Sequence, residues 1–325
     1  MPPRVSVIIP TYNRSEFLER AIKSVIQQTF RNFEIIVVEN GNPNRDAKVI
    51  VNRFLNSDVV VRHFYETKPS HVQARNIGVC HATGEYIAFL DDDDEWTPTK
   101  LAEQVKFMES HPEVGLIACN LTFFDREGHR IDDPHPYYAG EIQLRDLVAK
   151  GCLINSLSAV MVKRDCFEKV GMFDKSFSIS NDYEFYVRTS MEFKIWSLDE
   201  RFVRYKFHES NASRNVVQKC EENIKVLKRL HRLDLKAYGV SSELLENTIG
   251  NRSKVFHGLA VDAMDRKEYR LATELFTVAF LKDPLIGLKI SWGRFQNPLY
   301  RLFRPYGAFV YCIGRFTEHF IVGDY

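Results

Sequence analysis

The hydrophobic and polar positions in the first third of the chain alternate between two periods. Buried strands are predicted by short runs rich in β-branched residues, which lie at 5–9, 33–38, 59–64 and 86–90. Helices are predicted where apolar residues recur at helical spacing, at 15–28, 46–55, 70–82 and 98–110. This alternation predicts an α/β domain with a mostly parallel sheet, helices on both faces, and ligand sites at the carboxyl ends of the strands.

The pattern continues less regularly and then becomes helical. Further strand patterns lie at 114–119, 157–163 and 201–207, and a helix is expected to begin near Asn181. Residues 124–140 are rich in Asp, Pro, Gly and His, which predicts an irregular insertion. Later helices are predicted at 215–235, 241–266 and 268–281, and 260–284 look like one tetratricopeptide-type helix pair. We therefore predict an α/β domain over 1–214 and an α-helical region over 215–325.

Composition narrows the class of protein. The chain has 325 residues, 45% of them hydrophobic, which is enough for a substantial core. Lys plus Arg number 44 and Asp plus Glu number 43, so no global charge favours nucleic acid as a partner. The six cysteines include no CxxC pair, which argues against a zinc module or a disulfide framework. We find neither a basic and apolar leader nor a run of about 18 uncharged apolar residues, so we expect a soluble or peripheral protein of the cytoplasm.

Five acidic residues, Asp91 to Glu95, directly follow the apolar strand that ends at Leu90. Two unit charges about 4 Å apart repel by about 4 kcal/mol at an effective dielectric constant of roughly 20. A bound cation, protonation or full exposure to water must therefore relieve the cluster. A divalent ion held by carboxylate oxygens is the simplest of these solutions.

Two other interpretations of the acids need no catalytic metal. Asp and Glu are favoured near helix N-termini, so these residues could simply cap the helix predicted at 98–110. A calcium-binding EF-hand loop requires glycine at its sixth position, but loops that start at Asp91 or Asp92 place Trp96 or Thr97 there. The EF-hand is excluded, and the helix-cap interpretation stays open.

Polar segments at the other strand ends carry a family resemblance. The ordered segments are VSVIIPTYNR, IIVVENG, ARNIGVCHATGEYIAFLDDDDEWTPTKL, VGMFDKSF and NDYEFYVR. Over about residues 5–215 this series resembles the family-2 glycosyltransferases of the GT-A fold, which is Rossmann-like. A nicotinamide-dependent oxidoreductase would also use a doubly wound sheet, but the turn after the first strand has no glycine to admit a pyrophosphate, which excludes it.

The resemblance implies an inverting, metal-dependent enzyme. It would move a sugar from a nucleotide-diphosphate donor, a uridine one, to a hydroxyl of a glycan or lipid-linked acceptor in polysaccharide or glycoconjugate synthesis. Asp93 would be the direct ligand of Mn²⁺ or Mg²⁺, and Asp91 and Asp92 would reach the ribose or the waters of the metal. His208 would complete the metal shell or touch phosphate.

The nucleotide-binding residues implied by the family pattern are Thr11, Glu39 and Arg75. The family usually has two aspartates where this chain has Glu39 and Asn40, so the contact to the base is altered. The alternatives are ordinary turn chemistry for Thr11 and a surface salt bridge for Arg75, but the ordered set of motifs favours the nucleotide-binding roles.

Asp182 is the implied catalytic base. It would take the proton of the acceptor hydroxyl as that oxygen attacks the anomeric carbon. Asn181 stands where the family has Glu, and a helix cap is the simpler explanation of an aspartate at this place. Because of the departures at Asn40 and Asn181, the alternative function is a sugar-nucleotide or glycan binding protein with a decayed transferase site.

The last segment, 285–325, mixes aromatic and basic residues. This composition suits an interfacial anchor on the inner face of an anionic membrane, because rings sit at headgroup depth and cations meet phosphates. Packing against the catalytic domain or a second subunit explains it equally well. We therefore expect either peripheral membrane contact or a role in homo-oligomer formation.

Overall fold

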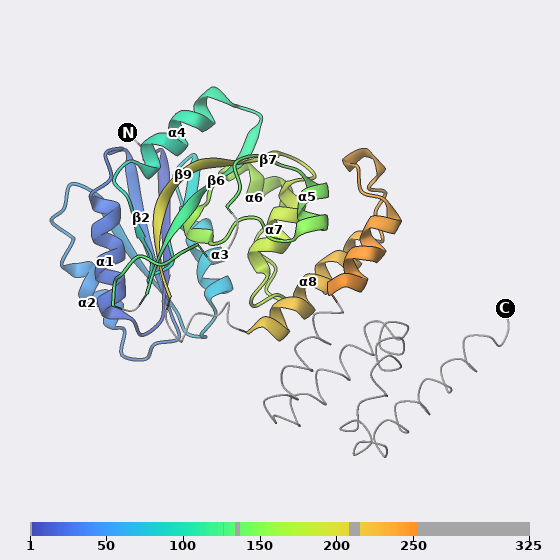
Figure 1. Cartoon of the computed structure of the whole chain (residues 1–325). Coiled ribbons are helices and arrows are strands. Elements are labelled where there is room, and N and C mark those ends of the chain that lie inside the picture. Colours follow the sequence, from blue (N-terminus) through green and yellow to red (C-terminus); the bar gives the residue numbers. More distant parts are fainter. Residues whose placement is uncertain (1, 126, 134–136, 208–214, 253–325) are drawn as a thin grey trace, which may run out of the picture. The chain divides into compact units, whose positions relative to one another are not determined.

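A computed structural model describes residues 2–125, 127–133, 137–207 and 215–252 (Figure 1). The chain divides into two compact units, 1–241 and 242–325. Residues 242–252 of the second unit are helical, as predicted. The tetratricopeptide-type pair and the aromatic segment 285–325 lie outside the described residues. That residues 1–214 form the whole catalytic domain stays a prediction.

A nine-stranded sheet is the centre of the first unit. Its strands are β1 Val5–Thr11, β2 Phe33–Asn40, β3 Val60–Glu66, β4 Tyr86–Phe89, β5 Glu95–Trp96, β6 Val114–Phe124, β7 Gly140–Ile142, β8 Met161–Lys163 and β9 Lys194–Lys206. The order is β3-β2-β1-β4-β8-β6-β9-β5, and β7 pairs with β9. The first four strands are all parallel, as predicted. Antiparallel pairs join β4 to β8, β8 to β6, and β9 to β5 and β7.

Helices cover both faces of this sheet (Figure 1). They are α1 Ser15–Ile26, α2 Asp46–Asn52, α3 His71–His81, α4 Lys100–Ser110, α5 Leu144–Lys150, α6 Arg164–Val170, α7 Asn181–Thr189 and α8 Val216–Leu230. Val7 and Ile9 of β1 belong to a hydrophobic cluster with buried residues of α1, α2 and α4. Ile8 points to the opposite face, because neighbouring strand residues alternate. There it meets Gly78 of α3, where an added Cβ would lie only 2.4 Å from Cγ2 of Ile8.

The second half of the chain departs from the predicted elements. Residues 157–159 form a 3-10 turn, and only 161–163 form a strand, so the strand predicted at 157–163 is partly wrong. The strand predicted at 201–207 is the end of the longer β9. Helices α5 and α6 were not predicted. Both are only seven residues long, too short for a clear helical period.

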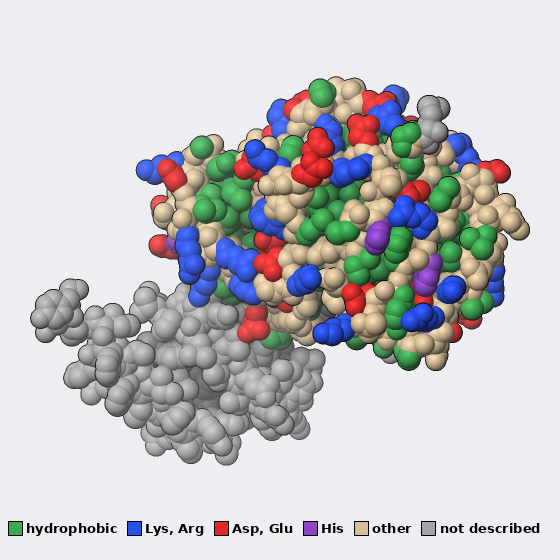
Figure 2. Space-filling model, turned by 180° about the vertical axis from the view of Figure 1, so that it is seen from behind, with side chains coloured by type: hydrophobic (Ala, Val, Ile, Leu, Met, Phe, Trp, Pro, Cys, Tyr) green, Lys and Arg blue, Asp and Glu red, His purple; other side chains and the backbone are tan. Residues whose placement is uncertain are grey.

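Charged side chains of both signs are distributed over the surface. On the face seen in Figure 2, basic and acidic side chains both occur among apolar ones, in keeping with the nearly balanced total charge. No helix in the described part of the chain is long and apolar enough to cross a membrane.

Candidate active site

A cavity of about 520 Å³ lies at the carboxyl ends of β1, β2 and β4. One wall comes from the turn at 10–14 after β1, from Asn40 at the end of β2 and from Asp91 to Asp93 after β4. Another part of the lining comes from residues 178–183 around the start of α7 and from Lys219 and Asn223 of α8. The strand ends therefore meet the α7 region across one hollow, as expected for an α/β sheet.

Asp92 and Asp93 are held by Thr11 and Arg14. Thr11 Oγ1 donates to Asp92 Oδ2 at 2.7 Å, and Arg14 Nη1 lies 3.2 Å from Asp92 Oδ1 and 2.6 Å from Asp93 Oδ2. Asp92 is only 5% exposed. Burial and the charge of Asp93 raise the pKa of Asp92 to about 7, although Thr11 and Arg14 counteract them. Both carboxylates thus share one guanidinium group.

Arg75 connects the acidic segment to α7. This nearly buried side chain donates from Nη2 to Asp91 Oδ1 at 2.8 Å and from Nη1 to Asn181 Oδ1 at 3.1 Å. Burial lowers the pKa of Arg75, but the charges of Asp91 and Asp182 outweigh burial and raise it above its ordinary value. Arg75 therefore stays charged and fixes the distance between the two walls of the cavity.

Asp94 does not cap a helix, so that interpretation is wrong for this residue. Helix α4 begins at Lys100, and its N-cap makes no side-chain hydrogen bond. Asp94 is buried, and Ser158 Oγ and Ser156 Oγ donate to its Oδ2 at 2.6 and 3.3 Å. Its Oδ1 has no hydrogen-bond partner among the described residues. Burial, followed by the charges of Asp93 and Asp91, raises the pKa of Asp94 well above its ordinary value, which favours its uncharged form. The buried group links two loops.

The protein's own groups therefore relieve the charge of the acidic segment. Arg75 faces Asp91, Arg14 faces Asp92 and Asp93, and Lys206 Nζ lies 2.6 Å from Glu95 Oε1. The raised pKa of Asp94 disfavours its charged form. A bound cation is thus one of several ways to stabilise the segment.

Asp182 lies in the first turn of α7, on the wall facing the acidic segment. Its Oδ1 accepts a hydrogen bond from the backbone N–H of Tyr183 at 2.7 Å, and the N-cap of α7 is Ser180. Burial raises the pKa of Asp182, while the Tyr183 N–H, Arg75 and Lys219 oppose that rise. A half-buried carboxylate with a raised pKa at a cavity wall is suited to general base catalysis.

Glu39 lies apart from the other predicted residues. Its side chain is fully buried and accepts from Asn42 Nδ2 and the Ala47 N–H, both at 3.2 Å, and lies 3.0 Å from His63 Nε2. It does not line the cavity, whereas Asn40 does. Asn40 Nδ2 donates to the Thr11 carbonyl at 2.9 Å. A contact between Glu39 and a base stays a prediction, and His208 lies outside the described residues.

Sequence analysis missed several residues of the cavity. His71 lines it, and burial, followed by the charge of Arg75, lowers the pKa of its imidazole to about 4, so it is neutral at pH 7. Lys219 and Asn223 of α8 line it as well, on a helix that was expected to lie outside the catalytic domain. The one signal that the sequence could offer for Lys219 and Asn223 is a polar residue at a position where the helical pattern of α8 calls for an apolar one.

Glu222 of α8 fixes the segment that leads into α7. Its carboxylate accepts hydrogen bonds from three consecutive backbone N–H groups, those of Ser178, Ile179 and Ser180, at 2.7–3.0 Å. Ser178 Oγ also donates to it at 2.9 Å. Burial alone would raise the pKa of Glu222, but these N–H donors lower it below its ordinary value. Helix α8 thereby positions the segment just before Asp182.

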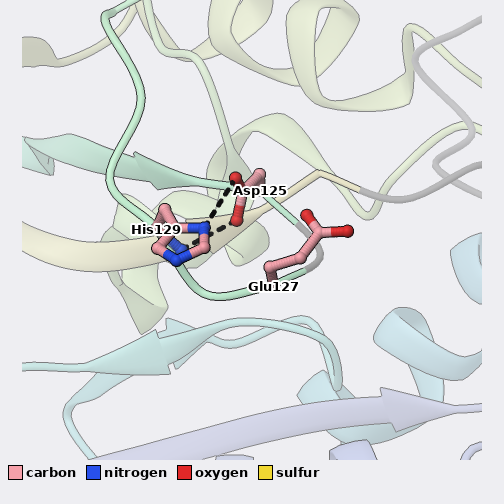
Figure 3. A group of neighbouring side chains, drawn as sticks. All are labelled: Asp125, Glu127 and His129. Carbon is pink, nitrogen blue, oxygen red and sulfur yellow. Dashed lines mark hydrogen bonds and ion pairs between the residues drawn. The ribbon is translucent and has the colours of Figure 1, made fainter.

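Metal-binding geometry was sought across the described residues. The one group of three close acidic or histidine ligands there is Asp125, Glu127 and His129 (Figure 3). Asp125 Oδ1 accepts from the His129 N–H at 2.7 Å, and Glu127 makes no contact with this pair in the figure. These contacts close the turn after β6, where Phe124 bridges to Arg130, and they explain the group without a metal.

The acidic segment fits a divalent ion better on chemical grounds. Asp91, Asp92 and Asp93 supply carboxylate oxygens to the cavity, the ligands that Mg²⁺ and Mn²⁺ prefer. The position of Arg14 between two of these carboxylates indicates that the structure favours positive charge there. The residues present therefore fit the ion.

Comparisons with solved structures show the same fold. Staphylococcus aureus TarS, residues 1–349 in complex with UDP-GlcNAc, superposes with a TM-score of 0.58 and 15% identity over 89% of this chain and 92% of that one. The mannosyltransferase PcManGT from Pyrobaculum calidifontis, in complex with GDP-Man and Mn²⁺, gives 0.58 and 18% over 87% of each chain. The fold is thus that of GT-A glycosyltransferases, as the sequence predicted.

Comparisons with curated sequences give the family. An uncharacterized glycosyltransferase of Haemophilus influenzae is 24% identical over 304 residues, 88% of this chain and 98% of that protein. One of Rickettsia typhi is 25% identical over 229 residues, 68% of this chain and 69% of that protein. The family described as glycosyl transferase family 2 matches residues 6–171, about half of the sequence. With its strand-end carboxylates, the cavity beside them and this match, the chain belongs to glycosyl transferase family 2.

Proposed function

We propose that this chain is an inverting glycosyltransferase that moves a sugar from a uridine diphosphate donor to a hydroxyl of a glycan or lipid-linked acceptor. The observation that carries the proposal is one cavity lined by both Asp91 to Asp93 and Asp182, in which Arg75 bridges Asp91 to Asn181, the neighbour of Asp182. Donor and base would then lie on opposite sides of the reacting carbon. Structural neighbours that hold UDP-GlcNAc or GDP-Man support a nucleotide-sugar donor.

The donor would bind along the strand ends. Thr11 and Arg75 would contact the nucleotide, Asp91 and Asp92 the ribose or metal-bound water, and Asp93 with His208 the metal. The Mn²⁺ in the PcManGT complex supports a divalent metal, Mn²⁺ or Mg²⁺. When bound, this ion would supply positive charge that stabilises the departing diphosphate.

Asp182 would carry the proton chemistry. The acceptor oxygen attacks the anomeric carbon, the bond from that carbon to the phosphate oxygen breaks, and the nucleoside diphosphate leaves. Asp182 takes the acceptor proton and later releases it to water. Its raised pKa would strengthen it as a base, and the charge of the nearby Arg75 opposes that rise.

The test is a screen of nucleotide-sugars with Mn²⁺, followed by NMR of the product anomer. Asp182→Asn should abolish turnover and leave donor binding intact, whereas Asp93→Ala should also remove the metal-dependent part of donor binding. Glu127→Gln, an exposed acid on the turn after β6, is the control and should turn over normally. Turnover by Asp182→Asn at the wild-type rate would refute the base assignment. Donor binding without turnover of any sugar would support the non-catalytic binding protein instead.

The C-terminal segment leads to a separate proposal. Peripheral attachment to the inner face of a membrane through 285–325, or homo-oligomer formation through it, would follow from its aromatic and basic composition. Liposome co-sedimentation and light scattering of the full chain and of a chain ending at Asp283 distinguish these two. If both chains stay off liposomes and remain monomeric, neither idea holds.

A further inference from the structure

Helix α8 brings two polar side chains to the cavity that carries Asp182. Lys219 and Asn223 both line this cavity, and they are four residues apart in α8, so they lie on one face of the helix. The charge of Lys219 reaches Asp182, whose pKa it lowers. Neither residue belongs to the strand ends at which the donor is proposed to bind.

Asn223 is buried although its amide group is not satisfied. The residue is 7% exposed, and its Oδ1 has no hydrogen-bond partner among the described residues. The preceding Glu222 is buried too, but three backbone N–H groups account for it. An unpaired buried amide destabilises a protein, whereas an apolar side chain of similar size does not. The place of Asn223 on the cavity therefore indicates a ligand that hydrogen-bonds to it.

Lys219 presents a positive charge to the cavity. Within the part of the chain that the structure describes, its ammonium group makes neither a hydrogen bond nor an ion pair, and the residue is half-buried. Arg14 and Arg75 of the same cavity are instead paired with Asp93 and Asp91. A charge that is partly shielded from water interacts strongly with a bound ion of opposite sign. Lys219 is therefore placed to bind an anion.

Helix α8 is fixed where it meets α7, so the two side chains are presented from a rigid element. The two helices pack against each other (Figure 1). Besides the contacts of Glu222, Gln218 Nε2 donates to Ser178 Oγ at 2.5 Å. Further along the helix, Arg229 Nη1 lies 2.7 Å from Asp174 Oδ2. Because these contacts flank the two side chains, a ligand does not have to order the helix when it binds.

The surroundings of the two side chains favour the acceptor over the donor as their ligand. The donor is proposed to bind at the strand ends after β1 and β4, whereas α8 contacts the segment that leads into α7. Asp182, the proposed base, lies in the first turn of α7 and must reach the acceptor hydroxyl. An ammonium group suits a phosphate or a carboxylate, and an amide offers both a donor and an acceptor to sugar hydroxyls.

We propose that Lys219 and Asn223 form an acceptor subsite, and that the acceptor is a glycan with an anionic group, a phosphate or a carboxylate, close to its reacting hydroxyl. The inference rests on the proposed function for the role of Asp182. Lys219 binds the anionic group, and Asn223 hydrogen-bonds to a hydroxyl of the same sugar. A neutral sugar satisfies Asn223 alone, so the subsite selects charged acceptors over neutral ones.

The test is an NMR titration of sugar probes against the full-length protein in saturating UDP and Mn²⁺, which occupy the donor site and keep the phosphate of a probe away from it. The probes are methyl glucoside, the corresponding uronic acid and the corresponding phosphate monoester, which differ only at the primary hydroxyl group. Wild type should bind both charged probes about tenfold more tightly than the neutral one. Lys219→Met should abolish this preference, and Lys219→Arg should keep it. Lys228→Met removes an exposed charge from the same helix, so it is the control and should behave as wild type.

Asn223→Leu tests the amide separately. Leucine has a similar size but no polar atom in its side chain, so all three probes should bind about fivefold more weakly, whatever their charge. The variant should melt no lower than wild type, because it removes an unpaired buried group. A lower melting temperature would show that Asn223 serves the packing of α8, and would overturn its part of the proposal.

The subsite is wrong if wild type has no preference for the charged probes, or if Lys219→Met and Lys228→Met weaken binding alike. It is also wrong if Lys219→Met loses affinity for UDP, because the ammonium group then serves the donor. A preference for one charged probe alone supports the subsite and identifies the anionic group. The readout is binding, so binding that depends on Lys219 without turnover of any sugar counts against the proposed transferase. Transfer to neutral acceptors alone counts against the subsite and not against the transferase.

Discussion

Removing the carboxylate of Glu222 should destabilise the wall that carries Asp182. In Glu222→Ala the N–H groups of 178–180 and the Ser178 hydroxyl lose their acceptor. The Glu222 side chain is only 9% exposed, so water replaces it poorly. The perturbation acts on one helix-to-loop contact and leaves the sheet unchanged.

The magnitude follows from these four hydrogen bonds. A hydrogen bond to a charged group stabilises a protein by about 1.5–3 kcal/mol, and bonds that share one acceptor are not additive. We expect Glu222→Ala to lower the free energy of unfolding by about 3 kcal/mol. Glu222→Gln keeps one acceptor oxygen and should lose about half as much.

Urea unfolding followed by tryptophan fluorescence measures this difference. Glu221→Gln, the neighbouring acid on the same helix, is the control and should change the free energy of unfolding by less than about 0.5 kcal/mol. Because the pKa of Glu222 is lowered in the folded protein, its contribution is present above its ordinary value of 4.5 and is lost as pH falls through the lowered value. A loss below about 1 kcal/mol for Glu222→Ala, or a loss that does not vanish in acid, would refute the reasoning.

Two further predictions concern Asp94 of the acidic segment and Asp182 of the cavity. Asp94→Asn should cost less than about 1 kcal/mol in urea unfolding and leave Mn²⁺ titrations unchanged, because the raised pKa of Asp94 favours its uncharged form, which Asn resembles; strong destabilisation would show that the group is ionised. Lys219→Met should raise the acidic pKa in the pH profile of kcat/KM, because Lys219 lowers the pKa of Asp182, and an unchanged profile would mean that Asp182 is not the titrating base.

The sequence predicted the parallel half of the sheet well. The runs at 5–9, 33–38, 59–64 and 86–90 became β1 to β4 within a few residues. Strands β1, β2 and β4 are buried along their whole length and are therefore rich in apolar residues, whereas the edge strand β3 is mostly half-buried. The antiparallel pairings of β8 and β9 were not predicted. They depend on which strand ends meet in space, and short segments such as 161–163 carry too few residues to show a period.

For the site, too, the sequence indicates candidate residues but not which of their side chains reach the cavity. Thr11, Arg75, Asp91, Asp92, Asp93 and Asp182 line one cavity. Strand-end positions pointed to Thr11 and to Asp91 to Asp93, whereas Arg75 and Asp182, which lie on helices, came from the family resemblance. Glu39 and Asn40 are neighbours in β2, and their side chains point to opposite faces, so only Asn40 lines the cavity. The sequence names both residues, but only the packing of the sheet decides which of them meets a ligand.

The sequence by itself therefore determined the α/β class, the order of the first four strands along the chain, and the types of residue that follow each of these strands. The tertiary structure decided which charges compensate one another. Arg14 reaches Asp93 across 79 positions of sequence, and Glu222 reaches Ser180 across 42. Such pairs follow from the folding of separate segments onto one sheet edge, and no local periodicity records them. For that reason the cluster of acids after β4 was predictable from the sequence, whereas the Arg and Lys side chains that pair with these acids were not.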